Sequence, residues 1–595
     1  MKKSMTKRTT KLFFYMITAA WFLFIHTGCG IMITQPVQPM IAAVEKEPVP
    51  DINRVTLQDH KAIYLEDDEG SVVTMYLTVR RGNLADNTDH SWEEVNRYSV
   101  SDYAAMGVER YAVEVILQIG DENGPLPGEL GYSEVVPNAV VNIRGASSSH
   151  HVQKSYKISL LESTEPWRGQ KTIALNKHVY DNVRFHNKLS YDYIKQIPDM
   201  IGLRTQFVHL YVKDETGGLS KSGYVDYGLF TQVELPNKTY LKNHRLDSNG
   251  HLYKAMFFEF ERYEENLKLK TDPKYNEALF SKILEIKGNE DHAKLLEMLD
   301  AVNDYGTSIE STFEKYFDAD NYFTWLAFNI LIGCIDTQSQ NFYLYSPSNS
   351  EKWYFIPWDL DSSWERYERE KISPDTGFEA GVMNYWGSVL HKRVLALPKY
   401  REMLDDKITS LRNIITVEKT REMIEIYKPV VLQHSFKMPD LMHIKLNTQQ
   451  FNEVCDEIPY EVERNYALYR DSFEKPMPFY LNPPEWIDEN KLRFSWEASY
   501  DFDAENITYT FELCRDYLFR DPIQAVSGLE IPLIETQMLS PGQYFYRVTA
   551  KNTSGCSQTA FDYYVDTEYV KHYGMMCFYV LEDGEVIVRK EVNLN

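Results

Sequence analysis

The stretch DADNYFTWLAFNILIGCIDTQSQNFYLYSPSNSEKWYFIPWDLDSSWE, residues 318–365, decides how this chain is expected to fold. Its first part places apolar residues on most faces of a helix that Asp318 or Asp320 can cap, a pattern typical of a buried helix. Two short apolar runs follow, at 342–345 and 353–356, joined by Pro-Ser-Asn-Ser. Two short strands joined by a turn are typical of an antiparallel hairpin. The stretch therefore predicts a buried helix, a polar loop and a hairpin.

The predicted hairpin brings the polar residues at its two ends together. Because a hairpin returns the chain to where it started, Asn341 and Asp359 are expected to lie close to each other. With Asp361 they offer the hard oxygen ligands that Mg²⁺ prefers, and Asp336 lies five residues before Asn341. Asp-x4-Asn, a hairpin and a metal-binding Asp is the layout of phosphoryl-transfer sites in protein kinases. We therefore predict Asp336 as the catalytic residue, and Asn341, Asp359 and Asp361 as metal ligands.

The segments CIDTQSQNFYLY and KWYFIPWDLDSSW resemble the core signature of the CotH kinases, a family named for spore coat protein H. The resemblance implies an α+β fold with an atypical, two-lobed protein-kinase domain. It also implies binding of ATP with Mg²⁺ or Mn²⁺, and phosphorylation of Ser or Thr in secreted or surface proteins. Residues 366–387 occupy the place where kinases carry a mobile segment, and we expect a loop there near the substrate entrance.

A second stretch, VVNIRGASSSHHVQKSYKISL at 140–160, predicts a strand, a small-residue loop and a second strand. This arrangement lays backbone amides and hydroxyls against phosphate, although a plain surface hairpin has the same pattern. The stretch also resembles the Arg-Gly-Asn-Ser-Ser segment and the following lysine-containing strand of CotH kinases. That resemblance implies nucleotide contacts from Arg144, Ser147, Ser148 and Lys154. Lys157 is the alternative lysine, because alternation places it on the opposite strand face from Lys154.

The run GYVDYGLFTQVELPNKTYL, residues 223–241, predicts a strand, a turn and a short helix. It resembles the Gly-x-Tyr-x-x-x-Glu strand of CotH kinases, with Phe230 in place of the Tyr and Glu234 kept. The resemblance implies a position for Glu234 beside the nucleotide, near the hinge between the lobes. A purely structural role for Glu234 is the alternative.

Composition limits the classes of protein to which the chain can belong. It has 595 residues, of which 43% are hydrophobic, and a formal net charge of −24. This charge argues against a nucleic-acid partner, since neutralising phosphates requires a basic surface, whereas a local basic cleft for ATP is compatible with it. Six cysteines without a CxxC pair indicate no zinc site. Cys514 and Cys556 lie in one region and are candidates for a disulfide.

The first thirty residues have the pattern of a targeting segment. A basic beginning is followed by a fourteen-residue apolar run at 12–25. His-Thr-Gly-Cys at 26–29 then resembles a lipoprotein signal with Cys29 as the lipidated residue. A lipoprotein is the first interpretation, an uncleaved membrane anchor the second and a released protein the third. All three place the bulk of the chain outside the cytoplasm, at the cell surface.

The character of the sequence changes near Pro476. Short predicted strands at 492–496, 507–513 and 544–550, separated by turns, indicate a β-sandwich. The series resembles a fibronectin type III module with Trp496 as its core tryptophan. We expect a signal segment at 1–30, a linker at 31–55, a CotH-like kinase domain at 56–475, the sandwich at 476–565 and a hairpin extension at 566–595.

Two function classes follow from these features. The first is a surface-anchored protein kinase that transfers the γ-phosphate of ATP to Ser or Thr of surface or spore-coat-type proteins. The second is a non-catalytic surface, adhesion or coat-assembly protein that retains the fold. A carboxylate-pair glycosidase is a weaker third reading, because the predicted group includes Asn341. The expected partners are ATP and a protein substrate, with a membrane contacted only through the N-terminal anchor and no nucleic acid.

Overall fold

The computed structural model describes residues 58–65, 67–217, 223–372, 377–488, 491–567 and 570–588. The targeting segment predicted at 1–30 and the linker at 31–55 lie outside these residues. Among the described residues, no helix has the length and the hydropathy that a membrane span requires. The fold mixes helices with several sheets and is of the α+β class.

The first sheet has eight strands and closes on itself. Closure arises at β1, which pairs in parallel with β7 on one side and antiparallel with β2 on the other. The strand order is β1 (Val72–Arg80), β7 (Thr205–Asp214), β8 (Val225–Val233), β6 (Thr172–Asn176), β5 (Ser155–Leu160), β4 (Ala139–Arg144), β2 (Ala112–Asp121) and β3 (Gly124–Pro125). Alternate residues such as Met75, Leu77 and Val79 are fully buried in one apolar cluster. Helices α1 (Trp92–Arg97) and α2 (Val100–Met106) add Trp92 and Tyr103 to that cluster.

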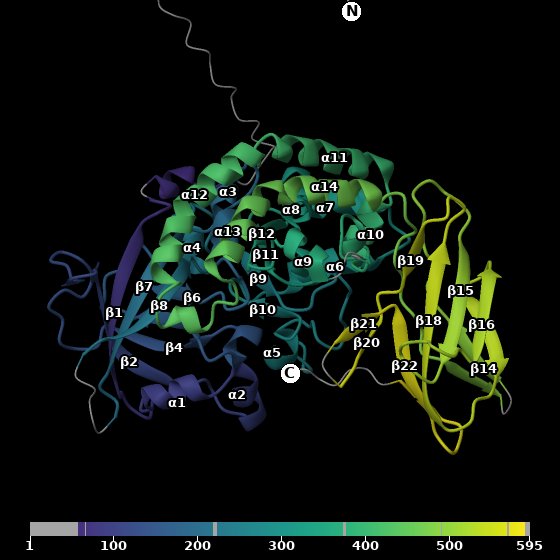
Figure 1. Cartoon of the computed structure of the whole chain (residues 1–595), viewed down its shortest axis with the longest axis horizontal. Coiled ribbons are helices and arrows are strands. Elements are labelled where there is room, and N and C mark those ends of the chain that lie inside the picture. Colours follow the sequence, from purple (N-terminus) through teal and green to yellow (C-terminus); the bar gives the residue numbers. More distant parts are fainter. Residues whose placement is uncertain are drawn as a thin grey trace, which may run out of the picture. The chain divides into compact units, whose positions relative to one another are not determined.

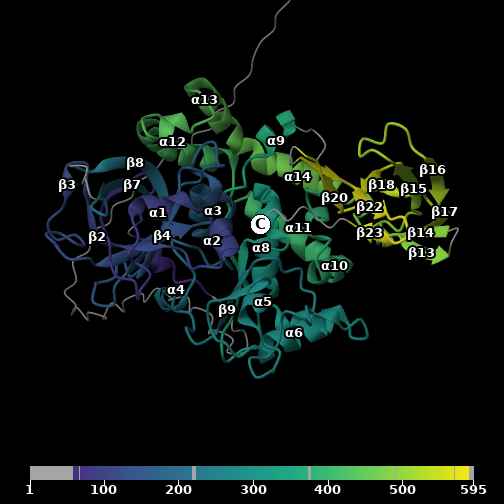
Figure 2. The same cartoon turned by 90° about the horizontal axis from the view of Figure 1, so that it is seen from below.

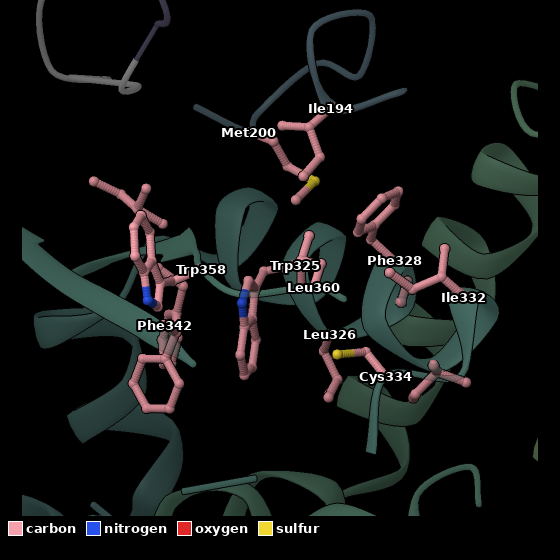
Figure 3. Packing of buried hydrophobic residues seen from close by; sticks show 14 of the residues in the cluster. Ile194, Met200, Trp325, Leu326, Phe328, Ile332, Cys334, Phe342, Trp358 and Leu360 are labelled. Carbon is pink, nitrogen blue, oxygen red and sulfur yellow. The ribbon is translucent and has the colours of Figure 1, made fainter. Parts of the chain in front are cut away.

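The second sheet is antiparallel and carries the predicted hairpin. Its order is β10 (Leu284–Ile286), β9 (His251–Ala255), β11 (Phe342–Ser346) and β12 (Tyr354–Pro357). The predicted helix is α8 (Ala319–Ile332), capped by the Asp318 side chain, which accepts from the backbone N–H of Asn321 at 2.9 Å. Trp325 of α8 packs on Phe355 and Phe342, with ring centroids 4.5 and 5.4 Å apart. Figure 3 shows Trp325 and Phe342 within this buried cluster. The predicted helix and hairpin are both confirmed.

Further helices pack against the two sheets. They are α3 (His186–Ile194), α4 (Lys238–Asn243), α5 (Glu277–Phe280), α6 (Ala293–Asn303), α7 (Ile309–Tyr316), α9 (Arg366–Ile372), α10 (Val389–Leu395), α11 (Pro398–Arg412), α12 (Val417–His434), α13 (Thr448–Glu457) and α14 (Glu461–Asp471). In both views α12 lies beside β7 and β8 (Figure 1, Figure 2), where Tyr427 and Phe207 have ring centroids 6.0 Å apart. Helix α11 begins at Pro398, because proline is favoured at a first helical position.

Residues 477–588, called the C-terminal β region below, form two further sheets and a separate hairpin. One sheet has the order β13 (Glu485–Asp488), β14 (Lys491–Ser495) and β17 (Leu533–Gln537). The other has the order β16 (Gln524–Leu529), β15 (Thr508–Cys514), β18 (Gly542–Lys551), β22 (Met575–Val580) and β23 (Val586–Val588), with β19 (Ser557–Thr559) beside β18. The hairpin pairs β20 (Tyr563–Val565) with β21 (Lys571–Tyr573). Trp496 is buried among side chains from both sheets. Cys514 and Cys556 are free thiols, so the disulfide considered from sequence is wrong.

Trp325→Ala should lower the free energy of unfolding by about 3–5 kcal/mol, because it leaves a cavity between α8 and the hairpin. Chemical denaturation monitored by circular dichroism measures this change. Leu84→Ala is the control, since Leu84 is 80% exposed and its truncation should change stability by no more than about 0.5 kcal/mol. Equal effects of the two substitutions would contradict the packing described for α8.

Candidate functional site

Asp336 lies in a single helical turn (Ile335–Thr337) that follows α8. Gly333 ends α8 in the left-handed conformation, at φ 67°, which glycine adopts at little cost. Two side chains from later in the chain hold the turn. Asn384 donates from Nδ2 to the Ile335 carbonyl at 3.1 Å, and the hydroxyls of Tyr385 and Thr337 are 2.7 Å apart.

The hairpin brings Asn341 and Asp359 together as predicted. Phe342 lies opposite Pro357, and one step outward the Trp358 N–H donates to the Asn341 carbonyl at 3.1 Å. Asn341 and Asp359 both have left-handed backbones, with φ of 60° and 54°. Asn and Asp adopt this conformation more readily than other non-glycine residues, and such backbone strain gathers at functional sites. The polar residues at the two ends of the hairpin are therefore held in a defined arrangement.

Asp361 is oriented by a histidine from the first sheet's side of the site. His178 Nδ1 lies 3.3 Å from Asp361 Oδ2. Burial opposes ionisation of Asp361, but the His178 hydrogen bond and the nearby charges of His178 and His186 lower the pKa of this carboxyl. Within the described residues, His178 Nε2 is buried without a hydrogen-bond partner. Asn187 accepts from the Leu360 N–H at 3.2 Å, whereas its buried Nδ2 also has no partner there.

The carboxylate of Asp359 lies near that of Asp361, and like charges repel. Burial and the charge of Asp361 raise the pKa of Asp359 to about 6, against the opposing effects of Arg144 and Lys254. A divalent cation would relieve both burial and like-charge repulsion, and two carboxylates with an amide suit Mg²⁺. The described residues contain no group of three His, Cys, Asp or Glu side chains placed for a metal. The predicted set does not have that form, because its third ligand is the amide of Asn341.

Two cations face Asp359 across Trp358. The Arg144 guanidinium, at the end of β4, lies 5.7 Å from the Trp358 ring centroid, and the Lys254 ammonium, on β9, lies 5.8 Å from it. Burial lowers the pKa of both side chains. Neither forms a hydrogen bond or ion pair with another side chain or carbonyl of the described residues. Both side chains are partly exposed and have no partner of opposite charge at hydrogen-bond distance among the described residues, so these two cations indicate a site for an anion.

Sequence reasoning identified Arg144 but missed Lys254. The only local signal is a lysine within the apolar strand HLYKA at 251–255. Its role depends on the pairing of β9 with β11, where Lys254 lies opposite Tyr343. That pairing joins residues about ninety positions apart in the chain, so local pattern could not reveal it.

The two candidate lysines, Lys154 just before β5 and Lys157 within it, lie in different surroundings. Lys154 is buried and donates from Nζ to the Ser149 carbonyl at 2.5 Å. On the other strand face, the pKa of Lys157 is lowered by burial and by neighbouring positive charges that include Arg144. The structure therefore places Lys157 on the side of Arg144. Which lysine contacts nucleotide stays a prediction.

The small-residue loop after β4 makes a tight turn, as its composition predicts. Gly145 has φ 89°, and a side chain there would collide with Ser148 Oγ. Ser147 is exposed, and its carbonyl accepts from the Tyr180 hydroxyl at 3.3 Å. Tyr180 is two residues from His178, so this loop lies near the Asp361 side of the site.

Glu234 is enclosed by protein partners. Arg204 reaches Glu234 Oε1 at 2.6 Å, and His244 reaches Oε2 at 3.1 Å. His244 in turn contacts Asp59 at 2.6 Å. Burial opposes ionisation, but His244 and Arg204 lower the pKa of Glu234 to about 2. Since both carboxylate oxygens are engaged, these contacts favour the structural alternative for Glu234.

The comparison with protein families identifies the class of protein. The family model described as CotH kinase protein matches residues 141–469. This range includes the hairpin, the predicted catalytic residue Asp336 and the three predicted metal ligands. The chain therefore belongs to the CotH kinase family. It is similar to the inner spore coat protein H of Bacillus subtilis (strain 168), with 24% identity over 328 residues that cover 54% of this chain and 85% of that protein.

Among solved structures, the chain is similar to one from the Shewanella oneidensis MR-1 toxin–antitoxin complex of HipA, HipB and operator DNA. The identity is 11%, and the match covers 62% of this chain and 79% of that one, with a TM-score of 0.25. At that TM-score we draw nothing about the fold.

Glu234→Gln should destabilise the protein near neutral pH without changing nucleotide affinity. Because folding lowers the pKa of Glu234 from 4.5 to about 2, its contribution is present above pH 4.5 and is lost as the pH falls towards 2. The difference in Tm between wild type and variant should therefore shrink over that range. Glu93→Gln, at an exposed surface pair, is the control. An unchanged Tm with weakened nucleotide binding would restore the predicted nucleotide role.

Proposed function

We propose that this chain is an atypical protein kinase that transfers the γ-phosphate of ATP to Ser or Thr of surface or spore-coat-type proteins. Family membership and the name of the Bacillus subtilis relative support a coat-associated protein. The observation that carries the catalytic reading is the charge arrangement at Asp359. There the cations Arg144 and Lys254 lie near the carboxylates of Asp359 and Asp361. A site that binds a metal ion together with a polyphosphate requires both kinds of charge.

The proposed domain organisation assigns the described sheets to functional parts. The closed sheet and the hairpin sheet with its helices form the two lobes of a kinase-like domain at 56–475. The C-terminal β region forms a fibronectin type III-like sandwich at 476–565 with the extension at 566–595. Residues from both lobes, Arg144 on β4 and Lys254 on β9, then border one nucleotide cleft. Anchoring through a lipidated Cys29 would place this unit at the cell surface.

In this proposal Asp336 orients the acceptor hydroxyl and accepts its proton. Burial raises the pKa of Asp336, against a hydrogen bond from Ser362 and the charge of Arg369. A higher pKa makes the carboxylate a stronger base for the hydroxyl proton. Ser362 directly follows Asp361, so it joins the catalytic residue to the loop of proposed metal ligands.

The remaining side chains bind the nucleotide. Asn341, Asp359 and Asp361 would hold Mg²⁺ or Mn²⁺, which neutralises phosphate charge when bound. Arg144 and Lys254 would hold phosphate oxygens directly, and a guanidinium presents several donors for that purpose. His178 keeps Asp361 oriented and ionised through the contact described above.

A non-catalytic coat-assembly protein is the second candidate function. The relative's name describes a coat component, which favours it. The intact set of Asp336, Asn341 and Asp359 favours the kinase. Transfer of radiolabelled phosphate from ATP to the protein itself, or to a co-secreted protein, separates the two.

Asp336→Asn and Asp359→Asn should both abolish transfer but differ in nucleotide binding. Loss of the proton acceptor at Asp336 should reduce transfer by about 10²-fold or more while Mg²⁺–ATP still binds. Loss of the Asp359 charge should also weaken nucleotide binding, to the level that wild type shows with a chelator. Radiolabel transfer and titration calorimetry measure the two effects.

Asp406→Asn, at an exposed position on α11, is the matched control and should change neither property. Near-normal transfer by Asp336→Asn would remove the role given to that residue. Equal metal-independent binding by Asp359→Asn and wild type would place the nucleotide elsewhere.

Lys254→Met should weaken ATP binding by about tenfold or more while leaving the free energy of unfolding unchanged or higher. The first effect follows from losing a charged contact with phosphate, and the second from removing an unpaired, largely enclosed cation. Calorimetry and denaturation measure them, with exposed Lys242→Met as the control. A destabilised variant with unchanged affinity would show that Lys254 serves the fold instead.

A further inference from the structure

The stretch 366–387 was expected to be a loop at the substrate entrance, but its first part forms helix α9 (Arg366–Ile372), so that prediction is wrong there. The C-terminal β region packs against the later part, the segment 377–387. The Phe378 ring lies 4.7 Å from that of Phe561 and 5.3 Å from that of Tyr573, measured between centroids. Phe561 is buried in the large apolar cluster around α8. The Tyr573 hydroxyl donates to Glu379 Oε1 at 2.9 Å. Apolar and polar contacts together therefore hold this segment on hairpin β20–β21.

The same segment holds the turn that carries Asp336. Asn384 and Tyr385 are buried, and they make the contacts to Ile335 and Thr337 described above. A continuous set of contacts thus runs from β21 through residues 377–387 to the catalytic turn. The turn is only three residues long, so these contacts are a large part of what fixes it.

Hairpin β20–β21 also presents a positive charge towards Asp336. Lys571 lies two residues before Tyr573 and so on the same face of β21. Its ammonium is 4.6 Å from the Tyr563 ring centroid, and its charge lies close enough to lower the pKa of Asp336. Among the described residues Lys571 has no ion-pair partner, whereas Arg369, the other cation near Asp336, is bonded to the Ser362 carbonyl and to Glu365.

We propose that the C-terminal β region helps to form the part of the site that binds the acceptor hydroxyl. Tyr573 and Glu379 are positioning residues that fix the turn bearing Asp336, and Lys571 borders the place where the acceptor hydroxyl binds. The inference rests on the proposed kinase function. It follows that acceptor phosphorylation depends on the C-terminal β region, whereas nucleotide binding at Arg144, Lys254 and Asp359 does not. A carboxylate that must be placed accurately against the acceptor hydroxyl to accept its proton requires such support.

The test uses the full chain with Tyr573→Phe and Lys571→Ala. The expected result is a fall of about threefold to tenfold in kcat for phosphate transfer, with Mg²⁺–ATP affinity within about twofold of wild type and an unchanged Tm. Glu379→Gln keeps an oxygen that accepts from Tyr573 and should retain more activity than Glu379→Ala. Tyr579→Phe is the control, because this hydroxyl in the same region makes no hydrogen bond within the described residues.

Hydrogen exchange of the amides at 335–340 tests the positioning without relying on activity. Tyr573→Phe should speed exchange there, and Tyr579→Phe should not. Unchanged exchange in Tyr573→Phe, or unchanged kcat in both Tyr573→Phe and Lys571→Ala, would overturn the inference. A wild-type chain that binds nucleotide but transfers no phosphate would overturn the proposed function instead, and exchange would still decide whether the C-terminal β region holds the turn.

Discussion

The antiparallel register of β11 and β12 is the constraint on which the rest of the site depends. With Phe342 opposite Pro357, the residues just outside the pair are Asn341 and Asp359, and their left-handed backbones are joined through the Trp358 N–H. Helix α8 fixes the hairpin from one side through Trp325 and delivers Asp336 to the same edge. A shift of one residue in this register would turn the ladder's side chains to the other face and separate these groups. The buried aromatic packing therefore fixes the positions of a small set of polar atoms.

The polar atoms themselves are arranged in a way that a stable fold alone would not favour. Two carboxylates lie side by side, Arg144 and Lys254 lack partners, and His178 and Asn187 each bury an atom without a hydrogen bond among the described residues. Elsewhere the same chain pairs its buried charges, as at Lys177 and Asp440, 2.7 Å apart, or Glu234 and Arg204. This contrast supports the site proposed around Asp359, because unpaired groups persist where a ligand completes them. It also reconciles a net charge of −24 with an anion site, since the cations are local.

Local sequence pattern predicted most of what is local. The buried helix, the hairpin and the tight loop after β4 follow from residue type and spacing, and the structure has them. The sequence allowed Asp318 or Asp320 as the cap, and the structure selects Asp318. Local pattern is misleading where distant pairing decides: the apolar spacing of Leu279, Ile283, Leu284 and Ile286 is typical of a helix, but β10 (Leu284–Ile286) pairs with β9. The short apolar run at 62–65 is likewise typical of a strand, but Lys61–Tyr64 form a helical turn. Lys254, the closure of the first sheet and the contact of Phe378 with Phe561 depend on residues far apart in the chain. No single-sequence pattern contains that information.

Closure of the first sheet has a consequence for how the protein meets its neighbours. An open sheet offers a row of unpaired backbone groups onto which another chain can add a strand, a route to aggregation. Both sides of β1 are occupied, by β7 and β2, and the strand that continues past β2 is the two-residue β3, which contains Pro125. The first sheet thus has little edge onto which another chain could add a strand, which lowers the tendency to aggregate where the local protein concentration is high. Longer edges, such as that of β16 (Gln524–Leu529), belong to the C-terminal β region. Among the described strands, β16 is therefore a more suitable edge for a partner that extends a sheet than the shorter edges β10 and β12 of the sheet that carries the proposed site.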